Sequence, residues 1–351
     1  MSSIVRSGVT AAAAVWLAAG AYPGASRMPA VDAQALPQAG DAPGDGLEVI
    51  QLRPNFFMIA GAGGNIGVQV GEDGAVVVDS GSAARADAVA ATIRRLSERP
   101  IRFVINTSAD ADHVGGNVAV SRAGETLLTP TGAAAAGGAA GLGGLTNDGA
   151  AGIIAAEAVI GRMSAPTGRE SPFPSAAWPT ESLPLGRATM FLNGEGIEIL
   201  HQPAAHTDGD AIVFFRRSDV VVAGDILDTT RFPVIDVERG GTIQGELDAL
   251  NRLIDLAIPS IPIVSRDAGT YVIPGHGRVF DHFDLVDYRD MVTIIRDRIK
   301  DLADAGMTLE RVKASSPARG YTRQYGATSG PWTTDMFVEA VYKTLPRENK
   351  Q

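Results

Sequence analysis

The feature that most constrains this chain is a polar segment that follows a short apolar run. Residues 101–105 (Ile-Arg-Phe-Val-Ile) predict a buried strand, and residues 106–117 read N-T-S-A-D-A-D-H-V-G-G-N. One serine, two aspartates and one histidine thus fall within six positions at the end of that strand: Ser108, Asp110, Asp112 and His113. Oxygen and nitrogen donors spaced this closely can converge on one point, as a metal ion requires.

Further donors follow predicted strands in the second half of the chain. There are five histidines, and three of them, His113, His206 and His276, occupy Gly-rich or turn positions at strand ends. Asp225 ends the predicted strand 220–224. A single histidine is more often structural than a metal ligand. Three in equivalent positions beside an acidic cluster favour a metal site.

Charge and cysteine content narrow the possible functions. The chain has 30 Lys and Arg against 40 Asp and Glu, so its net charge is −10 and its pI is near 5.0. That balance argues against a nucleic-acid-binding protein, which normally presents a basic surface. The absence of cysteine excludes disulfides, thiolate nucleophiles and cysteine-ligated zinc.

The N-terminal residues predict export from the cytoplasm. Arg6 precedes the apolar run Val9–Ala21, which has the length of a signal-peptide core. Small-residue cleavage patterns follow, so we expect a signal peptide and cleavage region over residues 1–33, then a linker rich in Pro, Gly and Ala over residues 34–46. The mature protein would be periplasmic or secreted and would have no stable membrane span. The alternatives are an uncleaved anchor and a disordered tail.

Strand and helix patterns predict two halves, each with strands followed by helices. The predicted strands cover residues 49–52, 56–59, 66–70, 75–79, 101–105, 190–192, 197–200, 211–215, 220–223 and 271–273. The predicted helices cover residues 83–96, 150–163, 247–256, 285–305, 308–314 and 333–345. This order indicates a layered sandwich with two sheets inside and helices outside.

Five short motifs in this order resemble those of the metallo-β-lactamase fold superfamily of hydrolases. They are D-S-G at 79–81, D-H-x-G-G-N at 112–117, A-H-T-x-G-D at 205–210, G-D at 224–225 and P-G-H-G at 274–277. The resemblance covers residues 47–280. It implies an α/β fold, the αββα four-layer sandwich, with the site at the edge of the two sheets. Residues 281–351 would form a helical C-terminal extension packed on the same domain, and residues 332–345 resemble secreted bacterial relatives of the SoxH-like group.

The chain departs from the first motif of that family. The usual H-x-H-x-D-H is S-x-D-x-D-H here, so Ser108 and Asp110 stand where histidines usually hold the first metal ion. The resemblance assigns the second-metal ligands to Asp112, His113 and His276, with Asp225 bridging. For the first metal only His206 and Asp225 remain, and Asp110 is a possible replacement. Asp79 and Ser108 would support the ligands, and Asp112 would also be catalytic.

The resulting expectation is a metal-dependent hydrolase with one or two divalent ions. Zinc is the first candidate, and manganese or iron is possible because carboxylate oxygens replace nitrogen donors. An ion-activated water would attack a small-molecule ester, lactone, lactam or phosphodiester. The alternative is a degenerate scaffold that binds a ligand or partner without catalysis. A di-iron electron-transfer protein is disfavoured because no flavin module is present, and a monomer is favoured because no coiled-coil segment is evident.

Overall fold

The computed structural model describes residues 46–127, 149–164, 169–183, 186–260 and 269–346. The predicted signal peptide and all but the last residue of the predicted linker lie outside these ranges. No helix within them is long and apolar enough to span a membrane.

The first sheet has seven strands in the order β1 to β7. Strands β1 to β4 form an antiparallel meander, and β5, β6 and β7 continue the sheet in parallel. The strands are β1 Glu48–Arg53, β2 Phe56–Ala60, β3 Ile66–Gly71, β4 Gly74–Val78, β5 Ile101–Ile105, β6 Gly152–Ala155 and β7 Glu181–Ser182. Strand β4 is buried along its whole length because both faces of the sheet are covered, and its sequence is accordingly almost continuously apolar.

The second sheet has five strands in the order β12-β11-β10-β9-β8. Strands β8 to β11 are antiparallel, whereas β12 joins β11 in parallel. The strands are β8 Arg187–Leu192, β9 Glu195–Gln202, β10 Asp210–Phe215, β11 Val220–Asp228 and β12 Tyr271–His276. The parallel pair places the C-terminal ends of β11 and β12 at the same edge.

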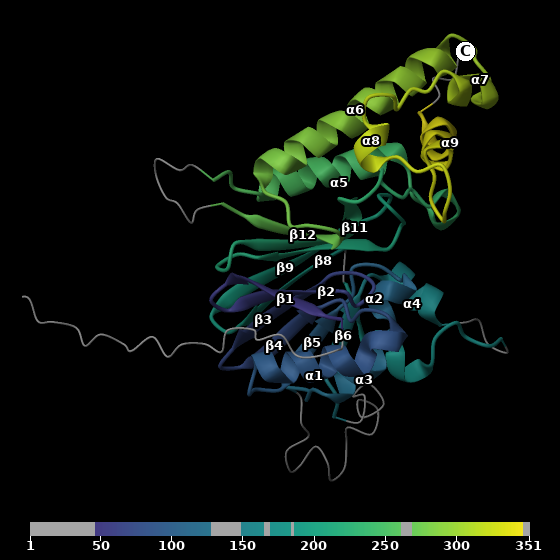
Figure 1. The fold of residues 1–351 in the computed structure, drawn as a ribbon. Coiled ribbons are helices and arrows are strands. Elements are labelled where there is room, and N and C mark those ends of the chain that lie inside the picture. Colours follow the sequence, from purple (N-terminus) through teal and green to yellow (C-terminus); the bar gives the residue numbers. More distant parts are fainter. Residues whose placement is uncertain (1–45, 128–148, 165–168, 184–185, 261–268, 347–351) are drawn as a thin grey trace, which may run out of the picture. The chain divides into compact units, whose positions relative to one another are not determined.

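Helices cover the outer face of each sheet (Figure 1). The first sheet carries α1 (Ala86–Leu96) and α3 (Asn117–Arg122), and α5 (Ile243–Leu256) packs on β11. Beyond α5 lie α6 (His282–Asp304), α7 (Leu309–Ala314), α8 (Thr322–Tyr325) and α9 (Thr334–Thr344). Two short helices near the sheet edge complete the set, α2 (Ala111–Val114) and α4 (Glu157–Met163).

Three clusters of buried apolar side chains separate the four layers. One lies between the first sheet and its helices, one between the sheets, and one between the second sheet and the C-terminal helices. Representative members are Val77 and Ile93 in the first, Phe56 and Phe215 in the second, and Val221 and Leu250 in the third. This layering confirms the predicted αββα sandwich with a helical C-terminal region.

Two predicted elements are wrong in detail. The helix expected over residues 150–163 is strand β6 followed by the shorter helix α4, because the run Gly-Ile-Ile-Ala at 152–155 pairs with β5. The strand expected to end at Asp225 continues to Asp228. It does so through an irregularity at Gly224, whose φ is +54° and where the pairing with β12 shifts register.

Candidate metal centre

The polar segment after β5 is held in place by a network of buried side chains. The Asn106 and Asn117 amides donate to each other's carbonyl oxygens at 3.0 and 2.8 Å, and Ser80 Oγ donates to Asn117 Oδ1 at 2.8 Å. Ser80 N also donates to the carbonyl of His113 at 2.8 Å. All these polar groups are buried and paired, so the segment has one well-defined conformation.

The six predicted ligands come together at one edge of the two sheets. Asp110 precedes α2, and Asp112 and His113 belong to it. The other three come from the second sheet, Asp225 within β11, His276 at the end of β12 and His206 in the β9–β10 connection. Their donor atoms form two groups, each within 4.8 Å, namely Asp112, His113 and His276 in one and Asp110, His206 and Asp225 in the other. Their roles as ligands stay a prediction.

The first of these groups, with Asp225 beside it, has the spacing of a metal site. Asp225 Oδ1 lies 3.1 Å from His113 Nε2 and 3.4 Å from His276 Nε2. Asp112 Oδ2 lies 3.1 Å from His276 Nε2. Ligands about 2.0 Å from a tetrahedral ion are roughly 3.3 Å apart, so these separations fit. Two imidazoles and two carboxylates also balance the charge of a divalent ion.

Asp79 lies where an orienting residue for His113 is expected. Its Oδ2 is 2.7 Å from His113 Nδ1 and accepts a 2.6 Å hydrogen bond from Thr107 Oγ1, while Oδ1 accepts one from Thr107 N at 2.8 Å. The Asp79 backbone has a φ of +65°, a strained conformation that aspartate tolerates better than most residues. These contacts fix the His113 ring with Nε2 directed toward Asp225.

The second group is arranged differently. Asp110 Oδ2 lies 2.8 Å from His206 Nε2, and Asp110 Oδ1 accepts a hydrogen bond from Arg239 Nη1. Asp225 Oδ2 is 3.9 Å from His206 Nε2. Ser108 Oγ accepts the backbone N–H of Asp110 at 3.2 Å, so it supports the loop. Both oxygens of Asp110 are therefore already paired with protein cations or donors.

Attraction between the imidazoles and the carboxylates shifts the pKa values of both kinds of group in this centre. Burial alone would lower the pKa of His206, but the hydrogen bond with Asp110 and the charge of Asp225 raise it to about 10. Burial likewise opposes the rise of the His113 pKa, which Asp225 and Asp79 hold well above its usual value. Burial would raise the pKa of Asp225, yet His113 and His206 keep it well below the usual range. Because the carboxylates raise the pKa values of these imidazoles, a metal ion that bound here would compete with protons for them.

Two features of the site are not evident from the sequence. Arg239 lies 129 residues after Asp110, in the stretch Asp236–Gly241, and no pattern connects the two. Asn65, in the turn between β2 and β3, also holds the His276 loop, because its Nδ2 donates to Pro274 O and Gly277 O at 3.0 Å. The sequence offers only an asparagine directly after two glycines as a signal for the latter.

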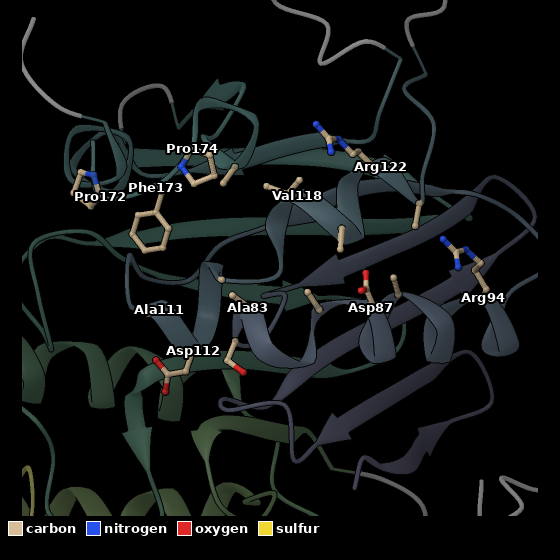
Figure 2. Close-up of a pocket in the computed structure, with 17 residues that line it drawn as sticks. Ala83, Asp87, Arg94, Ala111, Asp112, Val118, Arg122, Pro172, Phe173 and Pro174 are labelled. Atoms are coloured by element: carbon tan, nitrogen blue, oxygen red, sulfur yellow. The ribbon is translucent and has the colours of Figure 1, made fainter. Parts of the chain in front are cut away.

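A groove of about 1240 Å³ begins at Asp112 and runs between α1 and α3 (Figure 2). Its walls are small and apolar, with Ala90, Val118 and Ala119 on the helices and Phe173 on the facing loop. Figure 2 shows Asp112 at one end of the groove and Arg94 and Arg122 toward the other. The predicted metal ligand Asp112 therefore lies at one end of a mainly apolar groove.

Four layers of this kind, with histidine and aspartate donors at the sheet edge, define a class of metal-binding hydrolase folds. The family model described as the metallo-beta-lactamase superfamily matches residues 60–276, more than half of the chain. The chain belongs to this superfamily. Comparison with curated protein sequences gives no match.

Solved structures share the fold at low sequence identity. One is a double mutant of the sec-alkyl sulfatase PisA1 (15% identity, TM-score 0.58), and another is the stereoselective inverting sec-alkylsulfatase Pisa1 from Pseudomonas sp. (14%, 0.55). Each alignment covers 85% of this chain and 50% of that chain, so this chain spans about half their length. A metallo-beta-lactamase from Pontibacter korlensis aligns over 70% of this chain and 99% of its own (14%, 0.48). At these identities the similarity to the two alkylsulfatases shows the fold alone.

Proposed function

We propose that this protein is a metal-dependent hydrolase with a divalent ion at Asp112, His113, Asp225 and His276. The observation that carries the proposal is the convergence of these four side chains, from α2, β11 and β12, with donor separations of 3.1 to 3.4 Å. Donors that converge at these separations have the arrangement that a divalent ion requires. A non-catalytic surface cluster would not need this geometry.

The residues around the ion have distinct roles in this proposal. A divalent ion lowers the pKa of a coordinated water and polarises a substrate carbonyl or phosphoryl oxygen. Asp112, whose side chain is 37% exposed, lines one end of the groove and would accept the proton of an attacking water. Asp79 keeps His113 in the tautomer that presents Nε2 to the ion.

Zinc is the first candidate for the ion, because two imidazoles and two carboxylates suit a tetrahedral or five-coordinate centre. Manganese and iron are the alternatives, since half of the donors are oxygens. The donor set alone does not separate the three, so all of them belong in the first metal screen.

The groove points to a substrate with an extended apolar part beside the scissile bond. Esters, lactones, lactams and phosphodiesters are the substrate classes that such a centre can hydrolyse. The named function of the two alkylsulfatases adds alkyl sulfate esters to the compounds worth testing. We further propose a monomer that acts on small molecules in the periplasm or outside the cell and binds no nucleic acid.

The test begins with metal content. Protein purified without added metal or chelator is analysed by elemental mass spectrometry, alongside Asp112→Ala and His276→Ala variants. We expect a tightly held ion in the wild type, its loss in the variants, and loss of ester, lactone, lactam, phosphodiester or sulfate ester hydrolysis together with it. Full activity in chelator-stripped protein would contradict the proposal.

A second candidate is a scaffold that binds a ligand without catalysis. It is favoured by the ion pair between Asp110 and Arg239, because Asp110 stands where a histidine ligand is usual. Under this reading, the protein takes up no ion after incubation with zinc, manganese or iron. The same metal analysis therefore separates the two functions.

A further inference from the structure

The second donor group (Asp110, His206 and Asp225) contacts a cation of the chain itself, Arg239. The inference drawn from this contact rests on the proposed function of the first group. One oxygen of Asp110, Oδ1, pairs with the Arg239 guanidinium, and the other, Oδ2, lies 2.8 Å from His206 Nε2. His206 is the only imidazole of this group. His206 Nδ1 pairs with the carbonyl of Val234 at 2.8 Å, so this ring is fixed as well.

Arg239 is held in place from several sides. Asp236 accepts its backbone N–H at 2.9 Å and its Nε at 2.6 Å. The Arg239 carbonyl accepts hydrogen bonds from Asp208 N at 2.9 Å and from Arg162 Nη2 at 2.8 Å. The same loop binds the His206 backbone, because Asp236 N donates to His206 O at 2.9 Å. These contacts therefore fix the Arg239 guanidinium next to Asp110.

The residues at positions 108 and 110 agree with this arrangement. A neutral imidazole at position 110 would not attract a guanidinium, whereas an aspartate there forms a charge-assisted hydrogen bond with it. Ser108 uses its hydroxyl oxygen on the Asp110 N–H. The loss of two histidines and the presence of Arg239 thus form one complementary set.

A second divalent ion does not fit these residues. It would share Asp110 with the Arg239 guanidinium, and it would therefore lie next to a fixed positive charge. One imidazole and a shared carboxylate are too few donors to displace that charge.

We propose that the Arg239 guanidinium takes the place of the first metal ion, so that the protein binds one ion and carries its second cation within its own chain. The guanidinium neutralises Asp110 and sets the position of the His206 ring. The ion at the first group then lies near a positive charge that is part of the chain and cannot leave the protein as a bound ion can.

The test counts bound ions and needs no substrate. Wild-type protein is incubated with excess zinc or manganese, freed of unbound metal, and analysed by native mass spectrometry. We expect one ion per chain in the wild type and in Arg239→Lys, which keeps the charge. Arg239→Gln removes the charge and is expected to take up more than one ion at the same metal concentration.

Arg231→Gln is the matched control. Arg231 has 36% side-chain exposure, close to the 35% of Arg239, and pairs with Asp228 at 2.8 Å. This variant should keep one ion. Uptake of a second ion by Arg231→Gln would show that any lost arginine has the effect.

Each outcome has a distinct meaning. Two ions in the wild type, or one ion in both wild type and Arg239→Gln, would overturn this inference and leave the proposed hydrolase intact. No ion in any form would overturn the proposed function itself. If Arg239→Gln does not fold, electron paramagnetic resonance of the manganese-loaded wild type decides. An uncoupled six-line spectrum is expected, and an exchange-coupled pair would overturn the inference.

Discussion

Two glycines of the β2–β3 turn lie directly against the predicted metal ligands. A Cβ on Gly63 would lie 2.9 Å from Asp112 Cβ, and a Cβ on Gly64 would lie 2.8 Å from His113 Cε1. Gly64 N also donates to Asp112 O at 3.1 Å. Side chains at these positions would push on the ligands, which explains why the turn is built from glycine.

Replacing Gly64 with alanine is expected to weaken metal binding about 10- to 100-fold, the usual cost of disturbing the support of a ligand. The new methyl group forces the His113 ring to move, and the ring cannot move far because Asp79 holds it. Isothermal titration with zinc measures the affinity. Gly161→Ala is the control, since a Cβ there meets nothing within 4 Å. Unchanged zinc affinity in Gly64→Ala would contradict this prediction, because it would show that the β2–β3 turn moves and the His113 ring does not.

Glu246 is a buried acid in α5 without a partner. Neither of its carboxylate oxygens has a hydrogen bond among the described residues, and the side chain is fully buried. Burial, reinforced by the charge of Asp210, raises its pKa well above the usual 4.5. In the folded protein it therefore keeps its proton at pH values where the unfolded chain loses it.

This buried acid predicts a stability that falls as pH rises. Below about pH 4.5 both states are protonated, and from there up to the raised folded pKa the native state binds the extra proton. Stability then falls by at most about 1.4 kcal/mol per pH unit. In urea unfolding, the free energy of unfolding of Glu246→Gln should therefore rise relative to that of the wild type as the pH increases above about 4.5. The exposed Asp248→Asn of the same helix should show no such trend, and a pH-independent difference for Glu246→Gln would contradict the raised pKa.

At the scale of elements, the sequence predicts where the strands lie better than it predicts where each strand begins and ends. Short β-rich runs bounded by turn residues locate most strands of both sheets, because their periodicity and boundaries are local signals. The run 152–155 fails because a short buried strand and a buried helix segment have the same apolar pattern. Asp225 lies inside β11 because Gly224 lets the strand bend and continue.

The candidate site divides in the same way. Asp112, His113, His206, Asp225 and His276 can be predicted because each lies in a short sequence motif. The pairing of Asp110 with a distant guanidinium cannot, because it depends on how two loops 129 residues apart pack. Local motifs reveal donors, and only the fold reveals which donors are already occupied.

The α1–α3 groove makes a prediction about substrate size. Ala119→Trp would fill the groove between the two helices. Burial of one methylene contributes about 0.8 kcal/mol, so losing room for two of them raises KM about tenfold for substrates with a long apolar group. Short substrates should be unaffected, and so should metal content. Ala84→Trp, at an exposed position outside the groove, is the control. An equal rise in KM for substrates with short and long apolar groups would show that the substrate does not bind in this groove.

At the scale of the whole molecule, the C-terminal helices share a core with the second sheet. Leu285, Tyr288 and Ile295 of α6 and Phe337 of α9 belong to the same buried cluster as Leu250 of α5. Phe337 also stacks on Phe232, which follows β11, with ring centroids 4.9 Å apart. These helices therefore cover apolar surface next to the β11 loop that leads to Arg239.

Removing residues 281–351 should prevent stable folding. The truncated chain would expose the apolar face of α5, and burial of each large side chain contributes about 1.5–3 kcal/mol, against a total stability of about 5–15 kcal/mol. Near-ultraviolet circular dichroism and gel filtration should show lost tertiary structure or aggregation. A chain ending at residue 346 keeps all the described helices and is the control. A truncated protein that melts cooperatively would contradict this expectation.

The Asn65 amide joins the β2–β3 turn to the His276 loop across 209 residues of sequence. Contacts so distant along the chain form slowly and late during folding, because much loop entropy is lost before they are made. The metal-binding geometry therefore arises only when both sheets have docked. We therefore expect that a metal ion would not act as an early template for this protein and that its uptake would follow the docking of the two sheets.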